Sequence, residues 1–342
     1  MTAIEFNCLP TAIGSMPQTD PSAACAQVIK YLKEIPCWPQ LPNRAFKENM
    51  YAQYSQGFPG ITITGDKIFV DRAKDIDGPL EKLYAAYLEN DFAKYPVSAG
   101  YAAGLHAFLG LKGLSPLAVK GQVTGPVTWG LTVADSDGKA IIYDDVLGDA
   151  VARFLRLKAA WQEKELKKLS PNTIIFVDEP YMASFGSVSV PLSAARVKSL
   201  LEEVFRGIDG LKGIHCCGNT DWSVLLGTSL DIVSFDAYSY AQSLSLYPKE
   251  VKGLLGRGGA IAWGIVPNEG ASLGKETAAS LKDRLEEAMA PFTRNGVSFK
   301  QLLRQSLLTP SCTLASLDTP DAAARALELL ADLSRLMRKK LA

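Results

Sequence analysis

The stretch NTIIFVDEP, residues 172–180, combines a continuous apolar run with two acidic residues at its end. Such a run, without polar alternation, is typical of a strand buried on both faces of a parallel sheet. A helical pattern follows over 193–207, and a second strand-like run, GIHCC, lies at 213–217. This order of strand, helix and strand predicts a parallel α/β sheet.

The same alternation extends in both directions from this unit. Further strands are predicted at 11–15, 117–123, 231–236, 259–266 and 307–312. One more strand is either 35–41, which two prolines weaken, or 60–64, which could instead form an added hairpin. Helices are predicted over 21–33, 75–106 with a break near Pro96, 144–169, 222–228, 275–292 and 319–341.

About eight strands separated mostly by helices predict a closed (β/α)8 barrel. An open, doubly wound sheet is the alternative, but no Gly-x-Gly-x-x-Gly follows the first strand. We expect one catalytic domain over residues 1–342, with the barrel core at about 11–320. A chain of 342 residues fits one α/β barrel as well as two smaller domains.

The composition excludes several classes of protein. The formal net charge is zero, which gives no electrostatic basis for binding nucleic acid. The sequence contains no run of about 18 apolar residues, so we expect no membrane span. The first residues, MTAIEF, do not resemble a signal peptide, and the six cysteines are expected to be reduced thiols in the cytoplasm.

Reactive or polar residues cluster where the predicted strands end, which in such barrels is the active-site face. They are Ser15, Thr124, Asp178, Glu179, His215, Cys217, Asp236 and Cys312. Turn chemistry favours Asp, Ser and Gly at such places, but not His or Cys.

The sequence HCC at 215–217 carries the metal hypothesis. His215 and Cys217 are two apart, so in a strand both side chains point to the same side. Imidazole and thiolate are zinc ligands, and Cys312 at the end of the last strand would supply a third. The alternative is that the cysteines are small buried packing residues.

Several motifs, in this order, resemble those of the catalytic barrel of cobalamin-independent methionine synthase. They are AIGSMPQT at 12–19, TGPVT at 124–128, VDEP at 177–180, HCC at 215–217 and Cys312. HCCGNT at 215–220 also resembles the methylcobalamin:coenzyme M methyltransferases. Both families belong to the uroporphyrinogen decarboxylase-like superfamily of TIM barrels.

This resemblance implies a methyltransferase that methylates the thiol of homocysteine to form methionine, with Zn²⁺ as cofactor. His215, Cys217 and Cys312 would bind zinc, and Asp236 stands where the family has a glutamate as fourth ligand. The backbone of Ile13, Gly14 and Ser15 would hold the substrate carboxylate, and Asp178 would hold its ammonium group and be part of the catalytic site. Gln40, Asn43 and Glu48 are the candidates for a second ammonium anchor.

The chain differs from the folate-dependent enzymes after the seventh strand. GIVPN at 264–268 lacks the family's histidine, which serves proton transfer. A folate amine must be protonated to leave, whereas a methyl-corrinoid leaves as Co(I) without a proton. We therefore expect methylcobalamin or a corrinoid protein as the methyl donor. His106 is predicted to be structural.

Three alternatives remain at this stage. The acceptor could be coenzyme M or another small thiol, although Asp178 would repel a purely anionic acceptor. The protein could be a lyase of the porphyrinogen decarboxylase type, although no arginine cluster lies in the strand-end motifs. It could also be a binding module with a closed, structural zinc site of four protein ligands.

Overall fold

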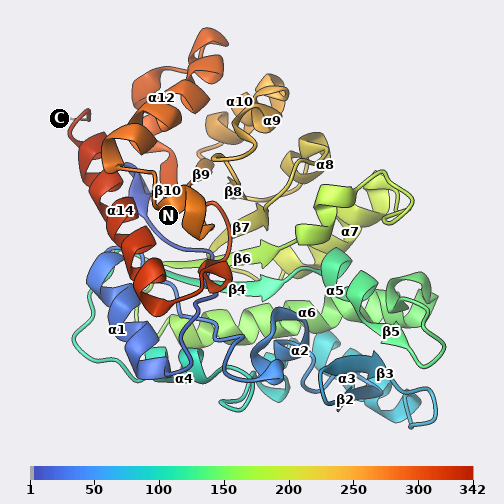
Figure 1. Ribbon diagram of the computed structural model, residues 1–342. Coiled ribbons are helices and arrows are strands. Elements are labelled where there is room, and N and C mark those ends of the chain that lie inside the picture. The colour runs from blue at the N-terminus through green and yellow to red at the C-terminus, as the bar shows by residue number, and fades with distance from the viewer. Residues whose placement is uncertain (1–3, 342) are drawn as a thin grey trace.

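The computed structural model describes residues 4–341. Its main sheet curls and contains seven parallel strands in the order β1-β10-β9-β8-β7-β6-β4 (Figure 1). The strands are β1 (Leu9–Pro10), β4 (Val119–Thr124), β6 (Thr173–Asp178), β7 (Leu211–Cys216), β8 (Ile232–Phe235), β9 (Ala260–Val266) and β10 (Ser306–Pro310). Neighbours in the sheet follow the order of the chain, and the first strand pairs with the last. This order is not doubly wound, because the strand order never reverses.

An extended segment at residues 36–40 lies between β1 and β4, where the eighth strand was predicted. It forms only isolated parallel bridges, Ser15 with Gln40 and Cys37 with Lys120. The amide of Gln40 donates to Gly14 O at 3.0 Å on one side, and the amide of Lys120 donates to Pro36 O at 2.9 Å on the other. Prolines have no amide hydrogen, so Pro36 and Pro39 prevent a continuous ladder. Within residues 4–341, the main sheet thus has seven regular strands and a linking segment instead of eight regular strands.

The other candidate for that strand, 60–64, is part of a hairpin. β2 (Ile61–Thr64) pairs antiparallel with β3 (Lys67–Val70), and β5 (Ala134–Asp135) adds a third strand. This small sheet is separate from the main one (Figure 1). In β2, isoleucines alternate with threonines, a pattern that is typical of a strand with only one covered face. The partial exposure of its residues agrees with this pattern.

Helices surround the outer side of the curled sheet (Figure 1). The longer ones are α1 (Pro21–Tyr31), α3 (Asp77–Leu88), α6 (Asp145–Leu166), α7 (Ala194–Phe205), α10 (Pro248–Gly256), α12 (Ala278–Arg294) and α14 (Pro320–Arg338). The shorter ones are α2 (Met50–Gln53), α4 (Ala103–Leu109), α5 (Pro126–Thr132), α8 (Trp222–Leu226), α9 (Ala241–Ser245), α11 (Gly270–Leu273) and α13 (Phe299–Arg304).

Side-chain caps explain where several of these helices begin. Asp20 accepts a hydrogen bond from the amide of Ala23 at 2.6 Å, and Pro21 is the first residue of α1. Asp144 and Thr319 cap α6 and α14 in the same way. The predicted helical stretch 75–106 is divided into α3 and α4, with the break around Pro96.

Two separate apolar clusters result from the curl of the sheet. The larger cluster fills the space between the sheet and its helices. The smaller one takes alternate residues from successive strands, such as Ile174 and Phe176 of β6 and Ala260 and Ala262 of β9. Alternate residues share a face, so this second cluster lies inside the curl, near the amino-terminal ends of the strands. The predicted site residues lie toward the carboxyl ends of the strands.

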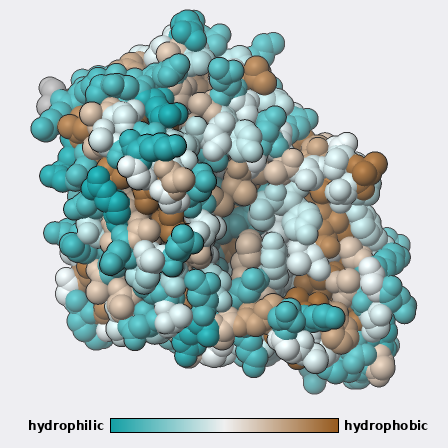
Figure 2. Space-filling model, in the orientation of Figure 1, coloured by the Kyte–Doolittle hydropathy of each residue, from teal (hydrophilic) through white to brown (hydrophobic). Residues whose placement is uncertain are grey.

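The face shown in Figure 2 is mostly hydrophilic, with hydrophobic residues in small groups and a hollow near its centre. Among the described helices, none has the length and apolar character needed to cross a membrane.

Candidate active site

His215, Cys217 and Cys312 lie together at the carboxyl ends of β7 and β10. One ligand atom from each residue falls within 4.8 Å of the other two. His215 is the last residue but one of strand β7, and Cys217 follows that strand directly. Cys312 follows β10 after Ser311. These residues, about one hundred positions apart in the chain, lie together because the carboxyl ends of parallel strands are at the same end of the sheet.

One ring nitrogen of His215 is held by the neighbouring strand. Nδ1 lies 3.0 Å from Ser234 Oγ, and Ser234 is the register partner of His215 on β8. Nε2 is buried and has no hydrogen-bond partner among residues 4–341. A histidine fixed through one nitrogen and free at the other is the usual state of a metal ligand.

The thiols of Cys217 and Cys312 are close enough to change each other's pKa. A hydrogen bond from Cys312, aided by His215, lowers the pKa of Cys217 to about 4. The same contact, together with burial, raises the pKa of Cys312. A metal ion bound between the two sulfurs would favour the thiolate form of both. The buried Nε2 and the two sulfurs form a nitrogen–sulfur donor set that fits Zn²⁺.

Asp236 does not belong to this group of three. It follows β8, and its Oδ1 accepts a hydrogen bond from the amide of Ser239 at 2.8 Å. Burial raises the pKa of Asp236. In this geometry Asp236 stabilises the loop after β8.

Asp178 and Glu179 are adjacent but have different environments. Asp178 ends β6, is buried, and its Oδ1 has no partner in the described part of the chain. Burial raises the pKa of Asp178 to about 6, while nearby Lys120 and His215 oppose the shift. Glu179 instead accepts hydrogen bonds from the amides of Val127 and Thr128 at 2.9 and 2.7 Å, at the start of α5. Glu179 is thus a structural residue, and Asp178 is the free carboxylate.

Ile13, Gly14 and Ser15 form an irregular turn after β1. Gly14 has a φ of +142°, and a Cβ there would lie 2.6 Å from the side chain of Gln122. Ser15 Oγ donates to Gln40 Oε1 at 3.1 Å. The amides of Gly14 and Ser15 donate to no backbone oxygen of residues 4–341. Free amides of this kind can bind a carboxylate.

Of the three candidates for a second anchor, only Gln40 contacts this turn. Its Nε2 donates to Gln53 Oε1 at 2.7 Å. Asn43 donates to Pro17 O at 3.3 Å, and Glu48 forms an ion pair with Arg44 at 2.6 Å.

The sequence interpretation missed Lys120, Gln122 and Ser234. Lys120 and Gln122 share the inward face of β4 with Thr124, which was recognised as a strand-end residue. The period of two along β4 was the available signal, since residues i, i+2 and i+4 line one face. His106 lies in α4, where its Nε2 is 2.9 Å from Val97 O.

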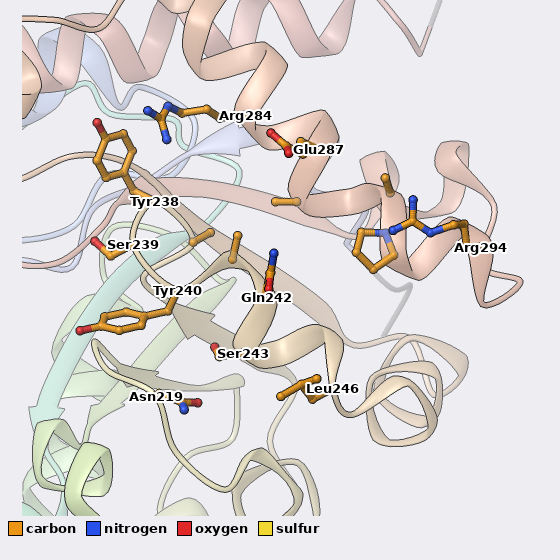
Figure 3. Close-up of a pocket in the computed structure, with 15 residues that line it drawn as sticks. Asn219, Tyr238, Ser239, Tyr240, Gln242, Ser243, Leu246, Arg284, Glu287 and Arg294 are labelled. Atoms are coloured by element: carbon orange, nitrogen blue, oxygen red, sulfur yellow. The ribbon is translucent and has the colours of Figure 1, made fainter.

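A cleft of about 690 Å³ lies beside the candidate site. Residues of the loop after β8 and of α12 line it, including Tyr238, Tyr240 and Arg294 (Figure 3). Asn219 is its one lining residue from the stretch 213–220, and none of the predicted site residues lines it. The cleft is therefore adjacent to the site and does not contain it.

No family model matches the sequence, and no curated protein matches it. Among solved structures, the fold is similar to that of a methyltransferase from Methanosarcina mazei, with a TM-score of 0.53 and 15% sequence identity. The similarity covers 94% of this chain and 86% of that chain. At this level of identity, the comparison establishes that the two proteins share an α/β fold of parallel strands.

Proposed function

We propose that this protein is a zinc-dependent methyltransferase that methylates a thiol, with homocysteine as the acceptor and methionine as the product. The observation that carries the proposal is the group formed by His215, Cys217 and Cys312, with a buried and unpartnered Nε2. A fold shared with a methyltransferase makes methyl transfer the first reaction to test. We also propose that the extended segment 36–40 takes the place of the eighth strand and closes the barrel.

His215, Cys217 and Cys312 would hold the metal. Zinc bound by one imidazole and two thiolates would lower the pKa of an acceptor thiol and orient it for attack. Ser234 keeps His215 in position through Nδ1. The fourth position would be left to the acceptor, because Asp236 is hydrogen-bonded to its own loop.

The remaining residues would bind the amino-acid part of the acceptor. The free amides at Gly14 and Ser15 suit a carboxylate, and Asp178 suits an ammonium group. Above pH 6 Asp178 is mostly ionised. An acceptor with a sulfonate and no ammonium, such as coenzyme M, would leave this buried carboxylate unpaired, which costs free energy. A porphyrinogen decarboxylase would need several cations for its carboxylates, whereas this site presents thiols and acidic residues.

We propose a methyl-corrinoid as the donor. A methyl-corrinoid would supply the methyl group: the acceptor thiolate would form the carbon–sulfur bond, and both electrons of the carbon–cobalt bond would stay with the corrinoid as Co(I). No proton is needed for this leaving group. The chain has two histidines, of which His215 belongs to the metal group and His106 contacts Val97 in α4. No histidine therefore remains to protonate a folate amine.

The test is methyl transfer by the zinc-loaded protein. Homocysteine is supplied with methylcobalamin in one reaction and with methyltetrahydrofolate in another, and methionine is measured. Methionine from methylcobalamin alone is the expected result. Methionine formed from methyltetrahydrofolate would contradict the proposal of a corrinoid donor. If the zinc-loaded protein formed no methionine from either donor, the proposed acceptor or the proposed reaction would be wrong.

A further inference from the structure

Lys120 is a fully buried lysine: burial lowers its pKa, and the nearby Cys37 and Asp178 oppose that shift. Its side chain is inside the curl of the sheet and has no exposed surface. Nζ donates hydrogen bonds to Ile13 O at 2.7 Å and to Gln122 Oε1 at 3.2 Å, and lies 4.3 Å from the centre of the Phe176 ring. No ion pair of Lys120 occurs within residues 4–341. Burying an ammonium group without a counter-ion is costly, which suggests that the charge has a use.

The ammonium lies directly below the turn that we assign to the acceptor carboxylate. Its shortest contact is with Ile13 O, the first carbonyl of that turn. The side chain of Gln122, which Lys120 also holds, fills the space beside Gly14 and donates to Trp38 O at 3.3 Å. Lys120 therefore fixes both the turn and the side chain that supports it.

The position of Lys120 relative to Asp178 gives the site opposite charges. Phe176 and Asp178 are two apart on β6 and share its inward face. The ammonium over Phe176 is thus one layer below the carboxylate of Asp178. The acidic group is free for an ammonium, and the basic group adjoins the amides that suit a carboxylate. This arrangement complements the two charges of an amino acid.

We infer that Lys120 is a positioning residue that makes the site selective for thiols carrying a carboxylate. It holds the turn 13–15 through Ile13 O, and its charge would attract the acceptor carboxylate in a region of low dielectric. This inference rests on the proposed function, because it assumes that an amino-acid thiol binds at the turn. It assigns to Lys120 no contact with the acceptor and no role in the transfer step.

The test compares two acceptors and two buried lysines. Aminopropanethiol is homocysteine without its carboxylate, so the ratio of the two dissociation constants measures how strongly the carboxylate is bound. The variant Lys120→Met keeps an unbranched side chain that is one atom shorter and removes the charge. The control is Lys158→Met, because Lys158 is also buried and donates to backbone carbonyls, Gln56 O at 2.6 Å and Pro96 O at 2.8 Å, in loops away from the turn.

Binding to the zinc-loaded proteins is measured by calorimetry, and methyl transfer is measured in parallel. The wild type should bind homocysteine about tenfold or more tightly than aminopropanethiol. Lys120→Met should reduce this ratio to near one, raise KM for homocysteine and leave kcat and zinc content unchanged. Lys158→Met should keep the wild-type ratio.

Equal loss of affinity for both acceptors in Lys120→Met would mean a structural role only, and would overturn the inference. Should that variant not fold, the wild-type ratio still decides, because equal affinity for the two acceptors in the wild type would also overturn it. If the wild type binds both thiols and methylates neither, the proposed methyl transfer is wrong, but the selectivity for a carboxylate can still be measured. If the wild type binds neither thiol, both the proposed function and the proposed role of Lys120 are wrong.

Discussion

At the scale of single residues, the candidate site depends on which of two similar neighbours faces the interior. Cys216 and Cys217 are adjacent, but Cys216 is buried in the outer core and Cys217 lies with His215 and Cys312 in the group that could hold a metal ion. Burial raises the pKa of Cys216 to about 12, whereas contacts with Cys312 and His215 lower that of Cys217. The alternation of side chains along a strand is enough to give the two thiols different chemistry.

This difference predicts the outcome of three cysteine substitutions. Cys217→Ser and Cys312→Ser should each lose zinc and reduce methyl transfer by at least about 100-fold, because a hydroxyl is a poor replacement for a thiolate. Cys216→Ser, the matched control, should keep both. Metal analysis and circular dichroism of the purified variants are the measurements. Unfolding of Cys312→Ser would favour a structural zinc site over a catalytic one.

The carboxyl of Asp178 predicts how acceptor binding depends on pH. Its pKa is raised from the ordinary 3.8 to about 6 by burial, so the group becomes protonated as the pH falls through 6. Only the ionised form attracts an ammonium. The affinity for homocysteine should therefore weaken by about tenfold for each pH unit below 6.

The control for this prediction is mercaptobutanoate, which is homocysteine without its amino group. The two compounds share a thiol and a carboxylate, so effects of pH on those groups cancel in the ratio of their affinities. A ratio that stays constant between pH 5 and 7 would exclude Asp178 as the ammonium anchor.

At the scale of elements, irregular segments contribute to the candidate site together with the regular strands. The turn 13–15 and the segment 36–40 contact each other through Gly14, Ser15 and Gln40. Both lack a regular ladder, and both supply polar groups to the interior. The apolar runs of β6 and β9 could be predicted from the sequence because they are buried on both faces. The segment 36–40 could not be assigned with the same certainty, since its prolines remove the pattern that marks a strand.

The turn at Gly14 predicts a sharp cost for adding one methyl group. Gly14→Ala should destabilise the protein by about 1–3 kcal/mol, because of the positive φ and the collision with Gln122, and should weaken homocysteine binding. Gly65→Ala is the control, since Gly65 also has a positive φ, +59°, but open space around it. It should cost only about 1 kcal/mol and leave binding unchanged. Chemical denaturation measures the free energy of unfolding of both variants. An equal loss of stability in the two would show that Gln122 moves away from the added methyl group of Gly14→Ala.

At the scale of the whole molecule, the sequence predicts the class of the fold and most of the strands, but not how the sheet closes. Asp178 and His215 lie at or near the predicted strand ends because a clear apolar run precedes each, whereas Cys312, predicted to end the last strand, lies two residues beyond β10. Lys120 was not recognised, because a lysine within a strand ordinarily suggests an exposed position. Only the three-dimensional arrangement shows that its ammonium lies inside the curl, on the ring of Phe176.

Removal of the metal should lower the stability of the whole fold. The proposed ligands connect β7 with the segment after β10, so a bound ion adds a link between distant parts of the sheet. Zinc should raise Tm by roughly 5–10 °C over the chelated protein. The Cys312→Ser variant should show no such difference, as measured by differential scanning calorimetry. An equal effect of zinc on that variant would place the bound ion elsewhere.

The pairing of the first strand with the last has a consequence for the order in which the protein is completed during synthesis. Leu9 pairs with Leu307, so the chain must be almost fully translated before β1 finds its neighbour. Closing so long a loop is a late and slow event in folding. Cys312 lies just beyond that last strand, and the proposed set of metal ligands is therefore incomplete until β10 has joined the sheet. Acquisition of the metal would then mark the end of folding, and a nascent or truncated chain would lack the full set of ligands with which to take up zinc prematurely.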